Sequence, residues 1–267
     1  MSTAEERAEM PEGSAPILDK RTLEKDYRTL VPLIQVGMRI LDVGCGSGAI
    51  SRGLAERVGP NGFVWGIDSS DYLIESGQKR HADIPNLRFT YEDLFAFAPA
   101  EKFDLIVSAR VLQWLDDPKG ALQKFKTLLK PEGMISILDY DHTALEWTPA
   151  PPASMKSFYA AFLQWRAEAG MNNQIARDLP AYFEEIGMRE IEVFESNEVY
   201  QKGAPNFPHK IGIWSAVAQS RGQQVVADGY FSEADRLKTI EEYDAWAATE
   251  AQMMVMKLRE VRGKLPI

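Results

Sequence analysis

The segment that most constrains the fold of this chain runs over Met38–Ile50 and reads MRILDVGCGSGAI. Its first half is apolar and rich in β-forming residues, so it predicts a buried strand over 39–43. Glycines follow at Gly44, Gly46 and Gly48. Glycine permits a tight turn and lets a ligand approach the backbone closely. The segment therefore predicts a strand, a ligand-binding turn and the start of a helix.

The same turn fits two kinds of nucleotide-like ligand. Gly44, Gly46 and Ala49 satisfy the dinucleotide fingerprint G-x-G-x-x-G/A, and Asp68 follows at about the spacing expected of a ribose-binding acid. Asp42 distinguishes the two ligands, because a carboxylate just before the glycines repels a pyrophosphate and suits a cation. S-adenosylmethionine carries an ammonium group, a sulfonium and no phosphate. It is the favoured ligand, and NAD is the alternative.

Apolar and turn-forming patterns alternate along the chain as in a doubly wound parallel sheet. The predicted strands cover residues 39–43, 63–67, 87–91, 103–108, 134–140, 190–194 and 252–258. The predicted helices cover residues 20–35, 49–58, 71–81, 120–129 and 179–186. This order of elements indicates an α/β fold.

Four ordered segments carry a resemblance to a known family. They read ILDVGCGSG followed by FVWGIDSS, then LRFTYEDLFAF, KFDLIVSARVLQWLDDP and LLKPEGMISILDY. Together they resemble the class I S-adenosylmethionine-dependent methyltransferases, in the branch that acts on small molecules, over about residues 20–140. The resemblance implies a Rossmann-like, seven-stranded, mostly parallel sheet with an antiparallel final strand, and helical insertions that form a lid. It also implies S-adenosyl-L-homocysteine as the product of methyl transfer to an O, N or C atom.

We expect one domain over residues 17–267, preceded by a disordered polar tail over 1–16. Two segments exceed the minimal family core, at about 141–177 and 206–246, and are expected to form a helical cap. The first is rich in aromatic residues and follows the fifth strand, where ligands of open α/β sheets bind. The second resembles two helices around a glycine-containing turn.

The composition of the chain excludes several classes of binding partner. A formal net charge of −9 and the lack of a basic stripe disfavour a nucleic-acid partner. Cys45 is the only cysteine, so an intrachain disulfide and a cysteine-based zinc site are excluded, and we expect no metal. No run of about 18 apolar residues and no signal-like start occur, so we expect a cytoplasmic protein without membrane contact, monomeric or homodimeric.

Cofactor contacts follow from the resemblance, position by position. Asp42, Gly44, Gly46 and Ser47 are expected at the methionine end of the cofactor, Asp68 on the ribose hydroxyls, and Ser69 beside the adenine. Asp93, or Glu92 in the adjacent register, is expected to accept from the adenine amine, with Leu94 against the ring; a turn cap is the alternative role of Asp93. Ser108, Ala109 and Arg110 are expected near the methionine carboxylate and the methyl group, although Arg110 suits an acidic group on the substrate equally well.

The residues that would bind the methyl acceptor are not indicated by a sequence motif. We expect the substrate pocket to include Tyr27, Tyr140, Trp147 and Tyr159. Asp141 and His142 follow the fifth strand and are the candidate general base, with a capping aspartate and a surface histidine as the alternative. Many relatives that methylate base or glutamine amino groups carry Asn-Pro-Pro-Tyr where this chain has Ser-Ala-Arg-Val, which argues against those acceptors. A cofactor-binding protein without turnover is the third functional hypothesis.

Overall fold

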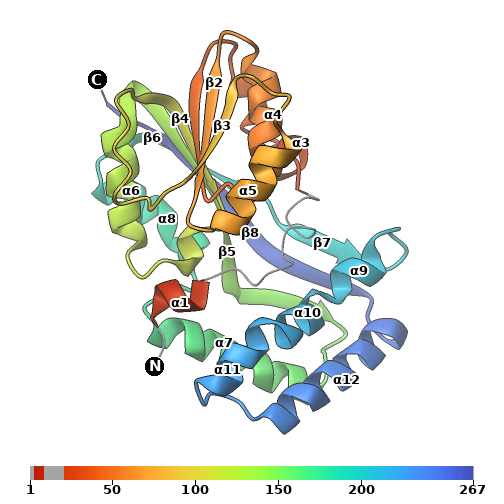
Figure 1. Ribbon diagram of the computed structural model, residues 1–267. Coiled ribbons are helices and arrows are strands. Elements are labelled where there is room, and N and C mark those ends of the chain that lie inside the picture. The colour runs from red at the N-terminus through yellow and green to blue at the C-terminus, as the bar shows by residue number, and fades with distance from the viewer. Residues whose placement is uncertain (1–2, 9–20, 267) are drawn as a thin grey trace.

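The computed structural model describes residues 3–8 and 21–266. A sheet body and a helical cap lie one above the other, and two long strands run from the first into the second (Figure 1). The strands are β1 (Arg39–Val43), β2 (Phe63–Asp68), β3 (Leu87–Tyr91), β4 (Phe103–Ala109), β5 (Leu129–Thr148), β6 (Arg189–Glu195), β7 (Glu198–Gln201) and β8 (Met253–Lys264).

The sheet is eight-stranded, with the order β3-β2-β1-β4-β5-β8-β6 and β7 paired to β8. β1 to β5 pair in parallel, whereas β8 is antiparallel to both β5 and β6. The predicted doubly wound sheet with an antiparallel final strand is therefore confirmed. The eighth strand, the four-residue β7, was not predicted.

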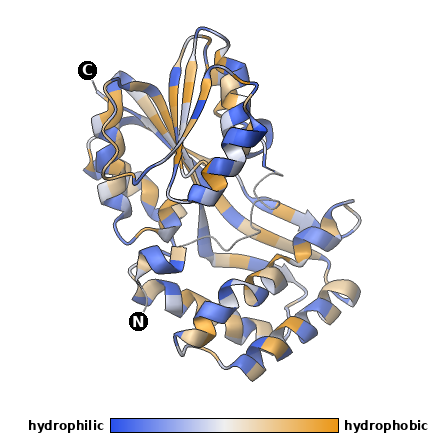
Figure 2. Ribbon diagram, in the orientation of Figure 1, coloured by the Kyte–Doolittle hydropathy of each residue, from blue (hydrophilic) through white to orange (hydrophobic). Residues whose placement is uncertain are grey.

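Helices cover both faces of the sheet body (Figure 1). They are α3 (Leu23–Asp26), α4 (Ala49–Val58) and α5 (Asp71–Arg80) on one face, and α6 (Pro118–Leu128) and α8 (Ile175–Glu185) on the other, with 3-10 turns η1 (Val31–Leu33) and η2 (Leu112–Trp114). In α4 the buried Ile50, Leu54 and Val58 recur every four residues, which gives one apolar face toward the strands. The strands and inward helix faces are accordingly the hydrophobic parts of the ribbon (Figure 2).

The continuous opening helix predicted over 20–35 is wrong. The chain forms α3, ends that helix at Tyr27, and resumes as η1 with Pro32 in its first turn. Proline has no N–H to donate to the carbonyl four residues earlier, and its ring clashes with that carbonyl, so a continuous helix through Pro32 is disfavoured. The break leaves Tyr27 in the core, where its hydroxyl donates to the Ser108 carbonyl at 2.8 Å.

Two further expectations need correction. β5 extends to Thr148, so the first insertion, which was expected to form part of a helical cap, begins as strand. Its far part pairs with β8 after a bulge between Asp141 and Glu146. The second insertion holds four helices rather than two, because Gly212 and Ser220 interrupt it. The cap helices are α7 (Ala153–Glu168), α9 (Phe207–Ile211), α10 (Ile213–Gln219), α11 (Arg221–Ala227) and α12 (Glu233–Thr249).

The N-terminal segment lies partly within the described residues. Ala4–Ala8 forms the short helix α1, so this part of the tail that was expected to be disordered is helical, and the rest of 1–16 lies outside the described residues. α1 lies between the sheet body and α7 (Figure 1). No helix in residues 3–8 and 21–266 is long and apolar enough to cross a membrane.

One hydrophobic core joins the sheet body to the cap. The same cluster of buried residues includes Leu54 and Val58 of α4, Tyr140 of β5, and Trp214 and Tyr243 of the cap. A second cluster fills the opposite face of the sheet beneath α6 and α8. The cap is therefore packed as part of the body, with the binding cavity between them.

Candidate functional site

A cavity of about 410 Å³ opens at the carboxyl ends of β1, β2, β4 and β5, beneath the cap. Its size falls in the range of small-molecule sites, roughly 300–1,000 Å³. The structure brings most of the predicted site residues to its wall: Asp42, Gly44, Gly46, Ser47, Asp68, Ser69, Glu92, Asp93, Leu94, Ala109, Arg110, Tyr140 and His142. Residues from distant parts of the chain thus share one enclosed space.

The glycine turn forms the floor of the cavity. Gly44 has φ +70°, a conformation that side chains disfavour, and a Cβ there would lie 2.2 Å from Cγ2 of Val111. The amide groups of Gly44 and Cys45 both donate to the Ile67 carbonyl. The turn is held against β2, with its backbone open to a ligand.

Asp68 is oriented by this turn. Its Oδ2 accepts from the Gly46 amide at 2.8 Å, and its Oδ1 accepts from the Ser70 amide at 2.9 Å. Each carboxylate oxygen has a further lone pair, so both remain able to accept from a ligand. Burial raises the pKa of Asp68, while the amide donors oppose this shift.

Asp42 is a second acid at the same cavity, and only 3% of its surface is exposed. The Ser51 hydroxyl donates to its Oδ2 at 2.6 Å. Burial raises the pKa of Asp42 to about 7, because the ionised form loses its hydration. A cationic ligand next to Asp42 would restore the ionised form.

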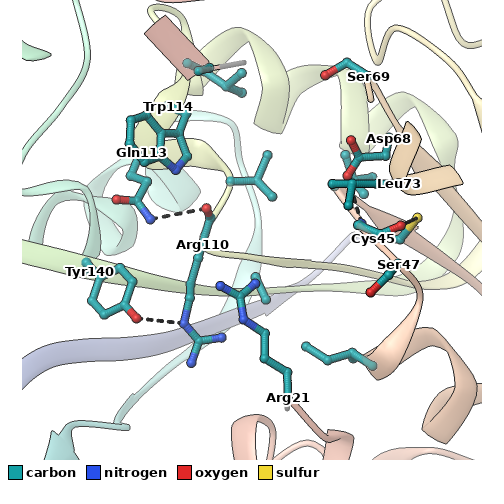
Figure 3. Close-up of a pocket in the computed structure, with 18 of the residues that line it drawn as sticks. Arg21, Cys45, Ser47, Asp68, Ser69, Leu73, Arg110, Gln113, Trp114 and Tyr140 are labelled. Atoms are coloured by element: carbon teal, nitrogen blue, oxygen red, sulfur yellow. Dashed lines mark hydrogen bonds between the residues drawn. The ribbon is translucent and has the colours of Figure 1, made fainter. Parts of the chain in front are cut away.

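Two guanidinium groups lie side by side in the wall, those of Arg21 and Arg110 (Figure 3). Arg110 has φ +63° and pairs through two of its three nitrogens: its Nη2 donates to Asp26 at 2.6 Å and to Glu198 at 2.7 Å, and its Nε donates to the Tyr140 hydroxyl. Its buried Nη1 has no hydrogen-bond partner among the described residues. No acceptor in the described part of the chain bonds Arg21. Arg21 is therefore the cation available to an anionic ligand group, and Arg110 is mostly a structural partner of Asp26 and Glu198.

His142 lies on the cap side of the cavity, with 7% of its surface exposed. Its Nε2 is 2.6 Å from Oε1 of Gln113, and its ring packs among those of Tyr140, Phe162 and Trp214. Burial lowers the pKa of His142 well below its ordinary value, and nearby Arg166 adds to this shift. The imidazole is neutral at pH 7, so it is not the surface histidine of the alternative reading.

Asp141 does not reach the cavity. Successive side chains of a strand point to opposite faces, so Asp141 faces away when Tyr140 and His142 face inward. Its Oδ1 accepts from the backbone amide of Thr143 at 3.0 Å and from the Thr143 hydroxyl at 2.6 Å. It is a turn-capping residue.

Four other expected residues also lie outside the cavity wall. Ser108 is buried in β4 and donates to the Val43 carbonyl. Trp147 donates to the Tyr243 hydroxyl at 3.2 Å, and Tyr159 donates to the His142 carbonyl at 2.5 Å. Together with Tyr27, these residues support the site from the core rather than contact a ligand. Asp93 lines the cavity but also caps a turn, because its Oδ1 accepts from the Ala96 amide.

Sequence reasoning missed several wall residues: Arg21, Gln113, Trp114, Phe162, Trp214, Val217 and Arg221. Gln113 and Trp114 lie shortly after the carboxyl end of the fourth predicted strand, so their position in the sequence could have indicated them. The sequence contained no signal for the cap residues, because the helix faces toward the core and toward the cavity are equally apolar. Among the described residues, no cluster of three or more His, Cys, Asp or Glu side chains suits a metal ion.

A family model described as a methyltransferase domain matches residues 34–202, which is more than half of the chain. The chain belongs to the methyltransferase domain family. The resemblance to class I S-adenosylmethionine-dependent methyltransferases is thereby confirmed. The matched segment runs from just before β1 to the end of β7.

Relatives of this methyltransferase domain include a malonyl-[acyl-carrier protein] O-methyltransferase of Ilyobacter polytropus, 36% identical over 36% of this chain and 36% of the relative. A trans-aconitate 2-methyltransferase of Azoarcus sp. is 34% identical over 51% of this chain and 54% of the relative. The chain thus spans about a third to a half of the curated relatives it matches.

The fold is shared with a solved methyltransferase. The Haemonchus contortus phosphoethanolamine N-methyltransferase 2, in complex with S-adenosyl-L-methionine, superposes with a TM-score of 0.55 at 16% identity. The match covers 90% of this chain and 53% of that one. This methyltransferase domain therefore has the same architecture with a largely different sequence.

Proposed function

We propose that the protein transfers a methyl group from S-adenosyl-L-methionine to a small molecule and releases S-adenosyl-L-homocysteine. The observation that carries the proposal is the pair of carboxylates in one cavity, the buried Asp42 and the half-buried Asp68, which lie on either side of the glycine turn. Family membership and the names of the relatives support the same activity.

The residues fit the chemical groups of this cofactor. Asp68 offers two acceptor oxygens to the ribose hydroxyls, and Asp42 offers a carboxylate to the ammonium group. Arg21 offers a guanidinium to the carboxylate at the same end. Ser69, Glu92, Asp93 and Leu94 line the remaining part, where the adenine would lie. The ammonium and carboxylate groups of the cofactor then each meet a side chain of opposite charge.

NAD fits the same residues less well. A pyrophosphate bound at the N-terminus of α4 would lie beside both Asp42 and Asp68, and like charges in a buried site repel strongly. The positively charged side chain of Arg21 lies beside that of Arg110 rather than over the turn at Cys45 and Ser47 (Figure 3). The dinucleotide alternative is therefore the weaker one.

The chain contributes positioning and exclusion of water. The cofactor supplies an activated methyl group, so holding the acceptor in line behind that group accounts for much of the acceleration. Trp114, Phe162 and Trp214 close the acceptor side with apolar rings, and Ala8 of α1 contributes a further part of the wall. The reaction thus takes place in a space closed by the cap.

The enclosed cavity favours a small acceptor over a macromolecular one. One of the two relatives is named an O-methyltransferase, which supports oxygen as the acceptor atom. The net charge of −9 disfavours nucleic acid. A cytoplasmic location and a monomeric or homodimeric state complete the proposal.

The experiment is thermal unfolding with S-adenosylhomocysteine, S-adenosylmethionine and NADH in parallel. Ligand that binds the folded state raises the midpoint, so we expect a rise with the first two compounds and none with NADH. Asp68→Ala should abolish the rise, and Asp83→Ala, at an exposed position outside the cavity, should retain it. A rise with NADH alone, or an unchanged rise in Asp68→Ala, would contradict the proposal.

Turnover needs its own measurement. We expect the protein to transfer a labelled methyl group from S-adenosylmethionine to a small-molecule fraction of a cell extract. Binding without transfer to any acceptor would favour the hypothesis of a cofactor-binding protein without turnover.

A further inference from the structure

Gln113 makes a hydrogen bond through each of its four polar groups, two in the backbone and two in the side chain. Its backbone amide donates to Asp139 Oδ2 at 3.1 Å, and its backbone carbonyl accepts from Arg166 Nη2 at 2.6 Å. Its side-chain Nε2 donates to the Arg110 carbonyl at 3.2 Å, as Figure 3 shows, and its Oε1 faces His142. Only 3% of its surface is exposed. Gln113 therefore has one fixed orientation.

This orientation determines the tautomer of His142. Since the amide nitrogen of Gln113 must face the Arg110 carbonyl, the atom at 2.6 Å from the imidazole is an oxygen, which can only accept. Nε2 of His142 then carries the proton, and Nδ1 carries the lone pair. The left-handed backbone of Arg110, with φ +63°, contributes by presenting its carbonyl to Gln113.

Nδ1 is accessible to a ligand. Within residues 3–8 and 21–266 no group hydrogen-bonds it, and it is not among the fully buried unpartnered atoms, although the residue lines the cavity. The backbone of His142 is fixed on both sides, because its amide donates to the Asn173 carbonyl and its carbonyl accepts from Tyr159. The lone pair thus has a fixed position at the acceptor side.

Resting on the proposed function, we infer that Nδ1 of His142 takes the proton of a hydroxyl acceptor and that Gln113 is the positioning residue that holds this tautomer. The hydroxyl oxygen forms a bond to the methyl carbon as the carbon–sulfur bond breaks, and the hydroxyl proton passes to Nδ1. The positive charge of the sulfonium ends on the imidazolium, which later releases the proton to water. Atoms and charge balance without a further reactant.

The surrounding rings indicate which hydroxyl compounds fit. The imidazole centroid lies 5.2 Å from Tyr140 and 6.2 Å from Trp214, and Trp114 and Phe162 complete an apolar wall. Flat, apolar molecules stack on such rings. A phenol or a planar enol is therefore the acceptor class, whereas a carboxylate acceptor, already ionised, would not need the base.

The tautomer can be read without any acceptor. The chain has three histidines, so ¹⁵N-histidine labelling gives few signals, and His142→Gln identifies those of His142. In protein saturated with S-adenosylhomocysteine we expect a protonated Nε2 and an unprotonated Nδ1 from pH 6 to 8. A proton on Nδ1, or an imidazolium over this range, would overturn the inference, while the saturation itself checks the cofactor site separately.

Two variants of Gln113 test whether this residue sets the protonation of His142 or only stabilises the fold around it. Gln113→Glu keeps the shape and adds a negative charge beside Nε2, so His142 should become protonated at a higher pH, and the acid limb of kcat should move upward with it. Gln113→Leu removes the acceptor and should lower kcat for phenols by at least about 10-fold. The other charged or titratable groups around the ring, Arg166, Tyr159, Asp139, Tyr140 and Arg110, stay unchanged in both variants.

A panel of phenols, aliphatic carboxylic acids and amines then tests the acceptor class. His142→Gln should lower kcat for phenols by roughly 10²-fold and leave cofactor binding intact. Methylation of the carboxylic acids or amines alone, at the same rate in wild type and His142→Gln, would overturn the inference and leave the methyltransferase proposal standing. An unmoved acid limb in Gln113→Glu would also count against it.

Discussion

At the scale of single residues, Asp42 couples ligand binding to pH. Its pKa of about 7 in the folded protein lies above its unfolded value of 3.8, so the folded state binds more protons between these values. The free energy of unfolding should therefore fall as the pH rises from about 4 to about 7, by up to about 4 kcal/mol from this group. Asp42→Asn should remove that part of the slope, which urea titrations at several pH values would measure.

The same ionisation should appear in cofactor affinity. A cationic ammonium group favours the ionised carboxylate, so the affinity for S-adenosylmethionine should rise as the pH increases from 5.5 to 7. Calorimetry in buffers of different ionisation enthalpy should show proton release in wild type and none in Asp42→Asn. Equal proton release in both would place the titrating group elsewhere.

Gly44 and Gly37 form a matched pair for testing the turn. Both have positive φ, +70° and +88°, so alanine costs about 1–2 kcal/mol at either position. Only at Gly44 would the new Cβ also meet Val111, at 2.2 Å. We expect Gly44→Ala to weaken S-adenosylhomocysteine binding at least about 10-fold and Gly37→Ala to leave it unchanged, as measured by calorimetry. Equal losses would mean that backbone strain alone is responsible.

A site residue could be predicted from the sequence where its role follows from neighbouring positions in the chain. Asp42, the glycines and Asp68 lie on consecutive elements and could be assigned from motif and spacing. The Gln113–His142 pair is separated by 29 positions and joins η2 to β5. Arg21 lies in the segment that was predicted as a helix over 20–35, and in the structure it precedes α3, which begins at Leu23. Contacts of this kind follow from tertiary packing, so they were visible only in the structure.

At the scale of elements, the cap shows why aromatic residues are ambiguous from sequence. Trp147 and Tyr159 were expected to face the substrate, but β5 continues through Trp147 as a strand, and strand pairing with β8 directs the Trp147 ring toward Tyr243 of α12. Trp214 of α10 faces the cavity instead. Helical or alternating periodicity identifies a buried face, and it does not distinguish a core from a cavity wall.

This assignment predicts opposite effects for two tryptophans. Trp147→Leu removes packing and the bond to Tyr243, so it should lower the free energy of unfolding by about 2 kcal/mol and leave the KM of the acceptor unchanged. Trp214→Leu removes part of the cavity wall and should raise that KM at least several-fold. Urea unfolding and steady-state kinetics on both variants give the comparison. A raised KM in Trp147→Leu would restore it as a pocket residue.

At the scale of the whole molecule, α1 closes the cavity from a distant part of the chain. Arg7 is buried, donates to the Trp165 carbonyl, and lies 5.0 Å from the Trp165 ring. Arg221 donates to the carbonyls of Arg7 and Ala8 at 2.6 and 2.9 Å, and Ala8 lines the cavity. The docked helix thus covers one side of the ligand.

Weakening the contacts of α1 should therefore change the rate at which the cofactor product leaves the cavity. We expect Arg7→Ala to increase the dissociation rate of S-adenosylhomocysteine by about 10-fold in stopped-flow measurements, whereas Glu5→Ala, exposed on the same helix, should not. If both variants release the ligand at the wild-type rate, α1 does not restrict exit.

The buried cluster shared by the sheet body and the cap also limits which sequence changes this protein can accept during evolution. Because Val58 and Leu54 belong to the same cluster as Trp214 and Tyr243, a cap exchanged for that of another family member would leave mismatched surfaces on both sides. Acceptor preference in this lineage would then change by single replacements at the cavity wall. New specificities should accumulate at positions such as Trp114 and Val217, which face the ligand, while the rest of the cap varies only within the constraints of a common interior.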